Sequence, residues 1–591
     1  MIKLSDYVFQ FLENKGIKHA FMLPGGGAMH LDDSIGKSGI EYTCFLHEQG
    51  AAIAAEAYAQ HTNTPGLVLV TSGPGATNAI TGVTAGWIDS TPMIIISGQS
   101  KRADLVGDKG VRQIGSQEVQ IIPMITPITK YAVQVLEPNE IKYHLEKAYL
   151  EATTGRPGPV WLDIPLDVQA VMLDEAKLEG YNPVEPEPET AGVKAAVEKT
   201  VELLKTAKKP LVLAGNGIKL SGATELLYQF IDELELPVET TWKTIDMFGE
   251  DENLYVGHPG IMGDRGANLI LQNADFILSI GCRLDTSVTA FNDRNFGKNA
   301  RKVIVDIDQN EINRMDMDKE ASVACDAGVF LKELLKIVTD EKCSLYNTDI
   351  MKEREKWLAW CKELRAKYPV ITEEHKNAKG YVSAYYFIGE LCKLLRNDDI
   401  IVPESSGGAG EITYQAFQLK KGQKMKNAAG LGSMGFGLPY AIGSCIANER
   451  HRTILINGDG AFQLNIQELE TLHRLKLPVK MFVWNNNGYA SIRSMQRNNF
   501  EGHYVASDEN SGLTMPHISK VAEAYGFKTY QIENNEELDK VLPEIMKDDT
   551  PMLCELMVLP EETVSPRVKA IVGENGKMMS GPLEKMWPYL D

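Results

Sequence analysis

The sequence lacks the features that mark secreted and membrane-spanning proteins. Its eight cysteines are scattered and form no CxxC pair, which favours reduced thiols over disulfides or a zinc site. No apolar run reaches the roughly 18 to 20 residues that span a bilayer. The N-terminal segment, residues 1–6, opens directly into a helical pattern and does not resemble a signal peptide. We therefore expect a cytoplasmic protein without a membrane partner.

Positive charge is also scarce. The chain has 60 Lys and Arg residues against 80 Asp and Glu residues, which gives a net charge of −20. This balance argues against nucleic acid and anionic membrane surfaces as partners, because both attract clustered basic side chains. The hydrophobic content of 43% and the charged content of 24% are typical of a globular protein, and 591 residues suffice for several domains.

Strand-like and helix-like segments alternate along the whole chain, which predicts an α/β protein with parallel sheets. We expect three Rossmann-like or flavodoxin-like domains. The expected division is a first domain at 1–170, a linker at 171–190, a central domain at 191–345, a helical connection at 346–379, a third domain at 380–560 and a C-terminal tail at 561–591. Alternating Pro and Glu at 181–189 favour an extended linker, and we expect the tail to pack on the surface rather than close over a site.

The most informative motif combines Gly458-Asp459-Gly460 with the Asn-rich residues 485–488. Strands are predicted at 452–456 and 479–484, with a helix at 465–477 between them. One strand-helix-strand crossover brings Asp459 and Asn486 to the same sheet edge. A carboxylate, an amide oxygen and a backbone carbonyl are ligands that Mg²⁺ takes together with phosphate oxygens. The motif predicts a metal-anchored diphosphate, although a polar turn of this kind is also common in α/β proteins.

Three further blocks accompany this motif. Residues 45–50 predict a strand followed by an alanine-rich helix with Glu48 in its first turn, where the helix dipole favours an anion. Residues 71–78 follow an apolar strand, and their glycines allow close backbone approach. In residues 430–439 Met434 stands among glycines, where a methionine could otherwise be ordinary core.

The four blocks, in this order and at these spacings, resemble the thiamine diphosphate (ThDP) enzymes, most closely the acetolactate synthase-like carboligases and decarboxylases. The resemblance covers about residues 2–560. It implies ThDP and Mg²⁺ as cofactors. It also implies that the cofactor lies between the first domain of one subunit and the third domain of another, in a homodimer or homotetramer.

The resemblance carries functional roles to matching positions. Glu48 matches the glutamate that hydrogen-bonds the aminopyrimidine ring and promotes ionisation of the thiazolium carbon. Met434 matches the side chain that supports the bent cofactor, Gly432 a carbonyl that holds its amino group, and Gln117 a glutamine near the reacting carbonyl. The implied metal ligands are Asp459, Asn486 and the backbone carbonyl of Gly488.

Further cofactor contacts are expected from the loops around these residues. The expected set is Pro24, Gly25, Gly26, Gly73, Asn78, Ser405, Ser406, Gly458, Gly460, Ala461 and Tyr489. The loop at 404–408 would line the diphosphate through its amides, although its sequence departs from that of the synthases. His47 is a candidate acid-base group, and a structural role is the favoured alternative.

Three departures from the synthase pattern affect the acceptor side. Ser287 stands where the family has an arginine that pairs with the second substrate's carboxylate, and a serine cannot replace a guanidinium fork. Leu166 replaces a lysine, and Met495 falls at a substrate-lining tryptophan. We therefore expect a 2-oxo acid donor, most simply pyruvate, and a carbonyl acceptor that need not be a second 2-oxo acid.

Several alternatives stay open. Residues 485–498 and 581–590 look like synthase-like proteins of bacterial surface-polysaccharide pathways, some of which act on a keto-sugar nucleotide. Arg493 and Arg497 could meet its diphosphate or could be solvated loop residues. A 2-oxo acid decarboxylase and a 2-hydroxyacyl-CoA lyase are further alternatives. FAD is undecided, because residues 215–217, Arg283 and Asp306 resemble its site while the Ser287 position does not.

Overall fold

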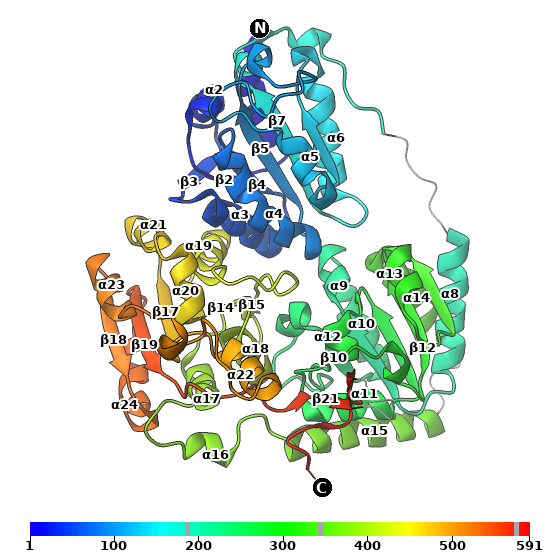
Figure 1. Cartoon of the computed structure of the whole chain (residues 1–591). Helices are drawn as coiled ribbons and strands as arrows, with labels where there is room; N and C mark the ends of the chain where they lie inside the picture. Colours follow the sequence, from blue (N-terminus) through cyan, green and yellow to red (C-terminus); the bar gives the residue numbers. More distant parts are fainter. Residues whose placement is uncertain (184–189, 341–347, 573–577, 591) are drawn as a thin grey trace.

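The computed structural model describes residues 1–183, 190–340, 348–572 and 578–590 (Figure 1). Three domains, each a parallel sheet covered by helices, follow one another along the chain. In Figure 1 the first domain lies at the top, the central domain at the lower right and the third domain at the lower left. The predicted α/β fold with three parallel-sheet domains is confirmed.

The first domain has a six-stranded sheet in the order β3-β2-β4-β5-β7-β6. The strands are β3 (Glu41–Cys44), β2 (His19–Met22), β4 (Gly66–Val70), β5 (Met93–Gln99), β7 (Pro159–Pro165) and β6 (Tyr131–Gln134). The central strands are wholly buried, as expected for a parallel sheet with helices on both faces. The helices α3 (Glu48–Thr62) and α4 (Pro74–Ile88) pack on one face, and α1 (Leu4–Asn14) and α6 (Ile141–Thr153) on the other.

The first domain extends beyond residue 170, so the expected start of the linker at residue 171 is too early. Strand β8 (Met172–Leu173) pairs antiparallel with β1 (Ile2–Lys3). Leu173 and Leu178 are buried in the core of the first domain, because their apolar side chains gain more from that core than from solvent. Residues 184–189 of the expected linker lie outside the described residues.

The central domain has a five-stranded parallel sheet in the order β10-β9-β11-β12-β13. The strands are β10 (Val238–Thr240), β9 (Pro210–Ala214), β11 (Phe276–Ile280), β12 (Arg301–Asp306) and β13 (Ala321–Ala324). Helices α8 (Thr190–Leu204), α10 (Thr224–Leu234) and α14 (Ala327–Val338) cover one face. After β9 the chain continues to β10 on one side, and after β11 it continues to β12 on the other side, so a topological switch point lies between β9 and β11.

The expected helical connection at 346–379 contributes a helix that covers the central sheet. Helix α15 (Thr348–Lys367) packs beside α11 (Arg265–Asn273) on the second face of the central sheet. Trp357 is buried there, and its Nε1 donates to the carbonyl of Pro210 at 2.9 Å. The charged surface pattern of α15 concealed these few buried contacts.

The third domain has a six-stranded parallel sheet in the order β15-β14-β16-β17-β19-β18. The strands are β15 (Lys424–Met425), β14 (Ile400–Pro403), β16 (Thr453–Gly458), β17 (Val479–Asn485), β19 (Met552–Met557) and β18 (Lys528–Ile532). One face is covered by α17 (Ala384–Leu394), α18 (Gly408–Ala416) and α24 (Asn535–Ile545), and the other by α19 (Gly437–Ala447), α21 (Glu468–Leu475) and α23 (Ile518–Ala524).

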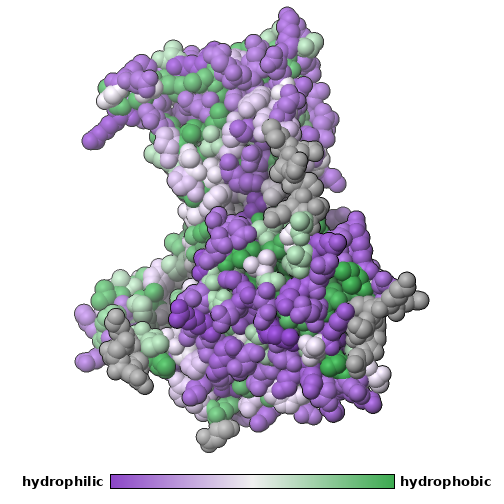
Figure 2. Space-filling view, turned by 90° about the vertical axis from the view of Figure 1, so that its right-hand side faces the viewer, coloured by the Kyte–Doolittle hydropathy of each residue, from purple (hydrophilic) through white to green (hydrophobic). Residues whose placement is uncertain are grey.

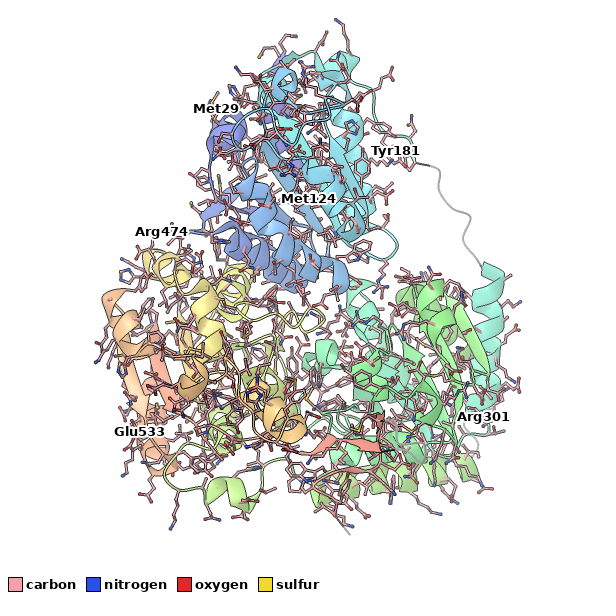
Figure 3. The ribbon with its side chains drawn as sticks, viewed as in Figure 1. Met29, Met124, Tyr181, Arg301, Arg474 and Glu533 are labelled. Carbon is pink, nitrogen blue, oxygen red and sulfur yellow. The ribbon has the colours of Figure 1, made fainter. Side chains whose placement is uncertain are left out.

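The first and third domains share one hydrophobic core, because α3 packs directly on α19. A Cβ atom on Gly443 would lie 2.2 Å from the carbonyl oxygen of Ala54, so the two helix backbones touch there. Arg474, at the same boundary in Figure 3, donates to the carbonyl of Cys44 at 2.7 Å. Figure 2 shows a largely hydrophilic face with several apolar patches, one of which lies at the narrowing between the first domain and the others.

The C-terminal tail packs on the central domain, as expected. Strand β20 (Arg567–Val568) pairs with β23 (Met586–Trp587), and β21 (Ala570–Val572) pairs with β22 (Met578–Ser580). The guanidinium of Arg265 on α11 donates to the carbonyls of Met586 and Pro588, at 3.0 and 2.7 Å. Within the described ranges, no helix has the length and apolar character needed to cross a membrane.

Candidate active site

The third domain brings Asp459 and Asn486 together at the carboxyl edge of its sheet. Strands β16 and β17 are parallel neighbours, Asp459 begins the helix α20 (Asp459–Phe462), and Asn486 follows β17 directly. The Asp459 Oδ2 atom accepts hydrogen bonds from the backbone amides of Asn486 and Gly488, at 3.2 and 3.0 Å. The predicted crossover is therefore confirmed, and it forms a compact polar edge.

The polar atoms at this edge fit a hard cation. The Asp459 side chain is 1% exposed, and burial raises the pKa of its carboxyl to about 6 despite its three backbone donors. The side-chain oxygen of Asn486 is buried and has no hydrogen-bond partner among the described residues. A buried carboxylate beside an unsatisfied amide oxygen suits Mg²⁺, which takes oxygen ligands. No group of three or more His, Cys, Asp or Glu side chains that could hold a metal occurs in the described part of the chain.

The hydrogen bonds of Arg493 differ from those expected from the sequence. Its guanidinium is almost fully buried and donates to four backbone carbonyls, those of Asn486 (2.6 Å), Asn487 (3.1 Å), Ser507 (3.0 Å) and Pro560 (2.9 Å). It therefore supports the loop after β17 from behind, and both expectations for it, a diphosphate contact and a solvated side chain, are wrong. Arg497 forms an ion pair with Glu561 at the surface.

Two other loops of the third domain border this edge. A Cβ atom on Gly460 would lie 2.4 Å from the ring of Tyr489, so the tyrosine covers the backbone after Asp459. Gly407 has a φ of +71°, and a Cβ atom there would lie 3.4 Å from the Ser491 hydroxyl. The loop that contains Ser405 and Ser406 therefore reaches the segment that follows Asn486.

Glu48 lies in the first turn of α3, as predicted. It is 7% exposed, and its Oε2 atom accepts a 2.9 Å hydrogen bond from the side-chain amide of Asn78. Its Oε1 atom lies beside Gly75, which has no side chain to cover it. The preceding His47 caps the helix, because its Nδ1 accepts from the backbone amide of Gln49 at 3.1 Å. The capping contact gives His47 the structural role that was the favoured alternative.

The predicted glycine-rich loops gather around Glu48. Gly73 has a φ of +60°, and a Cβ atom there would lie 2.5 Å from the carbonyl oxygen of Gln117. Gln117 itself has an exposed side chain and a φ of +66°. In the loop at 24–27, a Cβ atom on Gly25 would meet Thr71 at 2.5 Å, while Gly26 faces open space.

The segment with Gly432 and Met434 connects the two groups of residues within one chain. Gly432 has a φ of +63°, and the Met434 side chain is 38% exposed. The side-chain amide of Asn465 donates to the Gly435 carbonyl at 2.7 Å and to the Gln49 side chain at 2.9 Å. The glycine-rich segment thus lies close to the start of the helix that carries Glu48.

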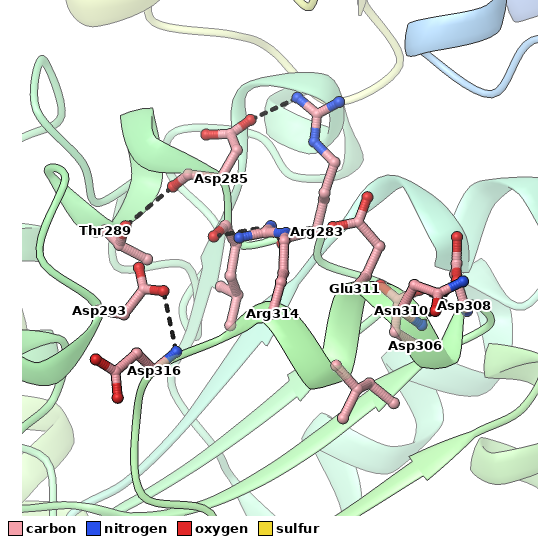
Figure 4. Close-up of polar contacts among 12 residues, drawn as sticks. Arg283, Asp285, Thr289, Asp293, Asp306, Asp308, Asn310, Glu311, Arg314 and Asp316 are labelled. Carbon is pink, nitrogen blue, oxygen red and sulfur yellow. Dashed lines mark hydrogen bonds and ion pairs between the residues drawn. The ribbon is translucent and has the colours of Figure 1, made fainter. Parts of the chain in front are cut away.

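A separate cavity of about 450 Å³ lies in the central domain at the carboxyl ends of β9, β11 and β12. It includes the topological switch point, where α/β proteins commonly bind ligands. Figure 4 shows polar side chains at and beside its lining: Arg283 pairs with Asp285 at 2.7 Å, and the lining residues Asp306 and Glu311 lie nearby, next to Asp308. Burial raises the pKa of the Asp306 carboxyl to about 6.

All three Lys and Arg side chains among the described residues lining this cavity are already ion-paired. Arg283 pairs with Asp285, and Arg156 of the first domain pairs with Asp308 and Glu311 at 3.1 and 3.0 Å. The Lys243 ammonium lies where all three domains meet. It donates to Asp89 (2.9 Å), Gln60 (2.9 Å) and the carbonyl of Asn427 (2.7 Å). No sequence motif pointed to Lys243, because its three partners are distant in the chain.

Three family models match the chain, one in each domain. They are the N-terminal TPP binding domain of thiamine pyrophosphate enzymes at residues 2–122, the central domain at 197–334 and the C-terminal TPP binding domain at 406–556. The first and last matches contain the Glu48 and Asp459 groups described above.

Full-length similarity to named proteins agrees with these matches. The chain is 31% identical over 575 residues to the probable acetolactate synthase large subunit of Methanococcus aeolicus, covering 95% of this chain and 93% of the relative. It is 32% identical over 569 residues to the acetolactate synthase large subunit of Lactococcus lactis, covering 96% and 94%. It is 30% identical over 555 residues to the acetolactate synthase isozyme 3 large subunit of Escherichia coli, covering 93% and 92%.

Proposed function

The chain belongs to the acetolactate synthase-like thiamine pyrophosphate enzymes, and from that premise we propose its reaction. It decarboxylates a 2-oxo acid, most simply pyruvate, and transfers the two-carbon unit to a carbonyl acceptor. The observation that carries this proposal is the pairing of a buried Asp459 with the unsatisfied Asn486 oxygen, in the same chain as a helix-start Glu48.

The third domain would hold the diphosphate and its metal. Asp459, the Asn486 side-chain oxygen and the Gly488 carbonyl would coordinate Mg²⁺. The backbone amides of Ser405, Ser406 and the segment 458–461 would contact the diphosphate, and Tyr489 would cover Gly460. These assignments rest on the oxygen ligands available at the sheet edge and on the closeness of the loops.

The first domain would act on the ring end of the cofactor. When bound, ThDP supplies a carbon nucleophile and an electron sink for decarboxylation. Glu48 would hold or share a proton at the pyrimidine ring, because Asn78 fixes one of its oxygens and Gly75 leaves the other uncovered. The loops at 24–26 and 73–78 would form the floor of this site, and Gln117 would lie near the reacting carbonyl. Gly432 and Met434 would contact the pyrimidine ring from the third domain.

The residues that line the central cavity bear on which acceptor the protein uses. Ser287 lines the central cavity at the position where the resemblance to the synthases implies an arginine, and each Lys or Arg among the cavity's described residues already has an acidic partner. A second 2-oxo acid bound beside Ser287 would find no lining cation without an acidic partner for its carboxylate. This observation favours a second candidate, an acceptor whose reacting carbonyl has no carboxylate beside it, such as a keto-sugar nucleotide with its diphosphate held outside this cavity.

Flavin binding is a separate proposal about the same cavity. The switch-point position, the glycines after β9 and the buried Asp306 are compatible with a nucleotide cofactor such as FAD. The absorption spectrum of the purified protein tests this directly. We expect the native protein to show a flavin absorption band, and denaturation should release the flavin into solution. A colourless protein whose absorption spectrum does not change when FAD is added would overturn the proposal.

We also propose that the active unit is a homodimer or a larger homo-oligomer. Apolar side chains next to the site are exposed in the single chain, among them Leu46 (52%), Met434 (38%) and Leu464 (48%). A second copy would cover them and complete the site between its first domain and this third domain. Light scattering should then give at least twice the chain mass of 65.4 kDa, and a monomer that is fully active would contradict it.

The reaction is tested with purified protein, ThDP, Mg²⁺ and pyruvate, with and without a keto-sugar nucleotide. Acetolactate from pyruvate alone would support the synthase reaction despite Ser287. Pyruvate loss only with the sugar, and a product heavier by the two-carbon unit, would support the sugar acceptor. Acetaldehyde as the main product would indicate a simple decarboxylase. No pyruvate loss in any mixture would overturn pyruvate as the donor.

A further inference from the structure

The segment 428–436 precedes α19 and carries Gly432 and Met434, and its first end is tied to the residues that follow β14. The side-chain amide of Asn427 donates to the carbonyl of Glu404 at 3.0 Å. One residue later, the backbone amide of Ala428 donates to the Ser405 hydroxyl at 3.3 Å. The start of the segment is therefore held by Glu404 and Ser405.

The other end of the segment is tied to the same place. The Glu404 carboxylate accepts from the backbone amides of Phe436 and Gly437, at 3.3 and 2.9 Å. A Cβ atom on Gly437 would lie 2.8 Å from the Glu404 Oε2 atom and 2.6 Å from the Asn457 side chain. Only a glycine therefore lets the carboxylate approach this helix start.

The Glu404 carboxylate also fixes a second loop. Its Oε1 atom accepts from the backbone amide of Ser405 at 2.9 Å, where the loop at 404–408 begins. The side chain is fully buried at the N-terminus of α19, where the helix dipole favours a negative charge. Burial raises the pKa of the Glu404 carboxyl to about 7, and its backbone donors favour the ionised form.

We infer that Glu404, assisted by Ser405, is a positioning residue that clamps both ends of the segment 428–436. The clamp holds the Gly432 carbonyl and the Met434 side chain in place for the pyrimidine ring, and it sets the start of the diphosphate loop from the same carboxylate. Glu404 touches neither the metal ligands Asp459 and Asn486 nor the reacting atoms. The inference rests on the proposed function, because it assigns the segment to cofactor binding.

Glu562 provides a matched control in the same domain. Its buried carboxylate accepts from the backbone amide of Ala384 at 2.8 Å and from the Ser383 hydroxyl at 2.9 Å, at the start of α17. Both glutamates thus cap a helix of equal length, but α17 follows no segment that is assigned to the cofactor. A purely structural role would make Glu404→Gln and Glu562→Gln behave alike.

The test compares Glu404→Gln with Glu562→Gln in the full chain. In Glu404→Gln the new amide group points an N–H donor at a backbone N–H. Either the Gly437 amide, or the Ser405 and Phe436 amides, therefore lose their acceptor. We expect the dissociation constant for ThDP, measured by calorimetry in Mg²⁺, to rise at least tenfold in Glu404→Gln. It should change less than twofold in Glu562→Gln, at comparable losses of thermal midpoint.

A second measurement needs no cofactor. Hydrogen exchange should report slow amides at Phe436 and Gly437 in the native protein and faster ones in Glu404→Gln, with Glu562→Gln unchanged there. Ser405→Ala should speed exchange at Ala428, whose amide donates to the Ser405 hydroxyl. Equal ThDP affinity in both glutamine variants would overturn the inference. Rapid exchange at Phe436 and Gly437 in the native protein would overturn it independently. A native protein that binds no ThDP but shows the protected amides would contradict the proposed function and leave the clamp standing.

Discussion

The side-chain amide of Asn465 in the third domain donates a 2.9 Å hydrogen bond to the side chain of Gln49 in the first domain. The same amide donates to the Gly435 carbonyl at 2.7 Å. The residue after Glu48 and the residue after Met434 thus share one donor. The start of α3 is therefore held from the third domain by a contact that does not involve the Glu48 carboxylate.

Replacement of Glu48 by glutamine should separate chemistry from structure. The glutamine keeps an oxygen for the Asn78 amide but loses the acidity needed to share a proton with the ring. We expect pyruvate turnover to fall at least 100-fold, with the ThDP dissociation constant within a few-fold of the native value. Glu137→Gln, an exposed change in the same domain, is the control. Native turnover in Glu48→Gln would refute the assigned role.

Replacement of Asp459 by asparagine should make cofactor binding insensitive to Mg²⁺. The variant removes the only carboxylate among the proposed ligands and turns an N–H donor toward the amides of Asn486 or Gly488. We expect ThDP affinity to drop at least tenfold in calorimetry at fixed Mg²⁺, as it should for the native protein after chelation. Asp398→Asn, at an exposed position, should bind normally. Unchanged, Mg²⁺-dependent binding in Asp459→Asn would sink the metal assignment.

Gly443→Ala tests the contact between the first and third domains. Alanine normally stabilises a helix relative to glycine by up to about 1 kcal/mol. Here its Cβ atom would lie 2.2 Å from the Ala54 carbonyl oxygen, so α3 and α19 must move apart. We expect the thermal midpoint to fall, at a cost of about 1–3 kcal/mol for overpacking. Gly115→Ala, where the new atom meets open space, should leave the midpoint unchanged. A raised midpoint in Gly443→Ala would disprove the close packing.

His19 should make the first domain sensitive to acid. Burial lowers the pKa of its imidazole from 6.5 to about 4, and its Nε2 atom lies 2.9 Å from the Thr43 hydroxyl. Because the folded state disfavours the charged ring, its contribution is complete above pH 6.5 and is lost as the pH falls toward 4. At about 1.4 kcal/mol per pKa unit, the full loss is about 3 kcal/mol.

We expect the urea midpoint to fall between pH 7 and pH 4.5, and to fall less in His19→Gln than in the native protein. His451→Gln changes an exposed histidine and should follow the native curve. Parallel curves for all three proteins would show that His19 does not titrate as its burial requires.

Much of the candidate site could be predicted because its parts are local. Asp459 and Asn486 each follow a strand, and one crossover brings the ends of parallel strands together. Glu48 lies at the start of a helix, and the alanine-rich residues that follow it predict that helix. Glycines in the flanking loops marked places of close backbone approach, as at Gly73, which packs against the Gln117 carbonyl.

Contacts between distant residues could not be predicted in this way. The polar loop around Arg493 suggested a ligand contact or a solvated side chain, whereas its guanidinium is used up by four carbonyls. The charged pattern of α15 suggested a connection, whereas Trp357 and Cys361 are buried against the central sheet. Residues 171–178 suggested a linker, whereas two leucines complete the first core.

The sequence by itself determined the α/β class, the order of the domains and the loops that carry the proposed oxygen ligands, because these follow from local periodicity and from the geometry of parallel strands. Only the tertiary structure decided that Glu404 reaches both ends of the segment 428–436, that Lys243 joins three domains and that α3 and α19 touch at Gly443. Each of these depends on buried polar groups finding partners across long separations in the chain. Such pairings are set by how the packed layers close against one another rather than by the neighbours of each residue.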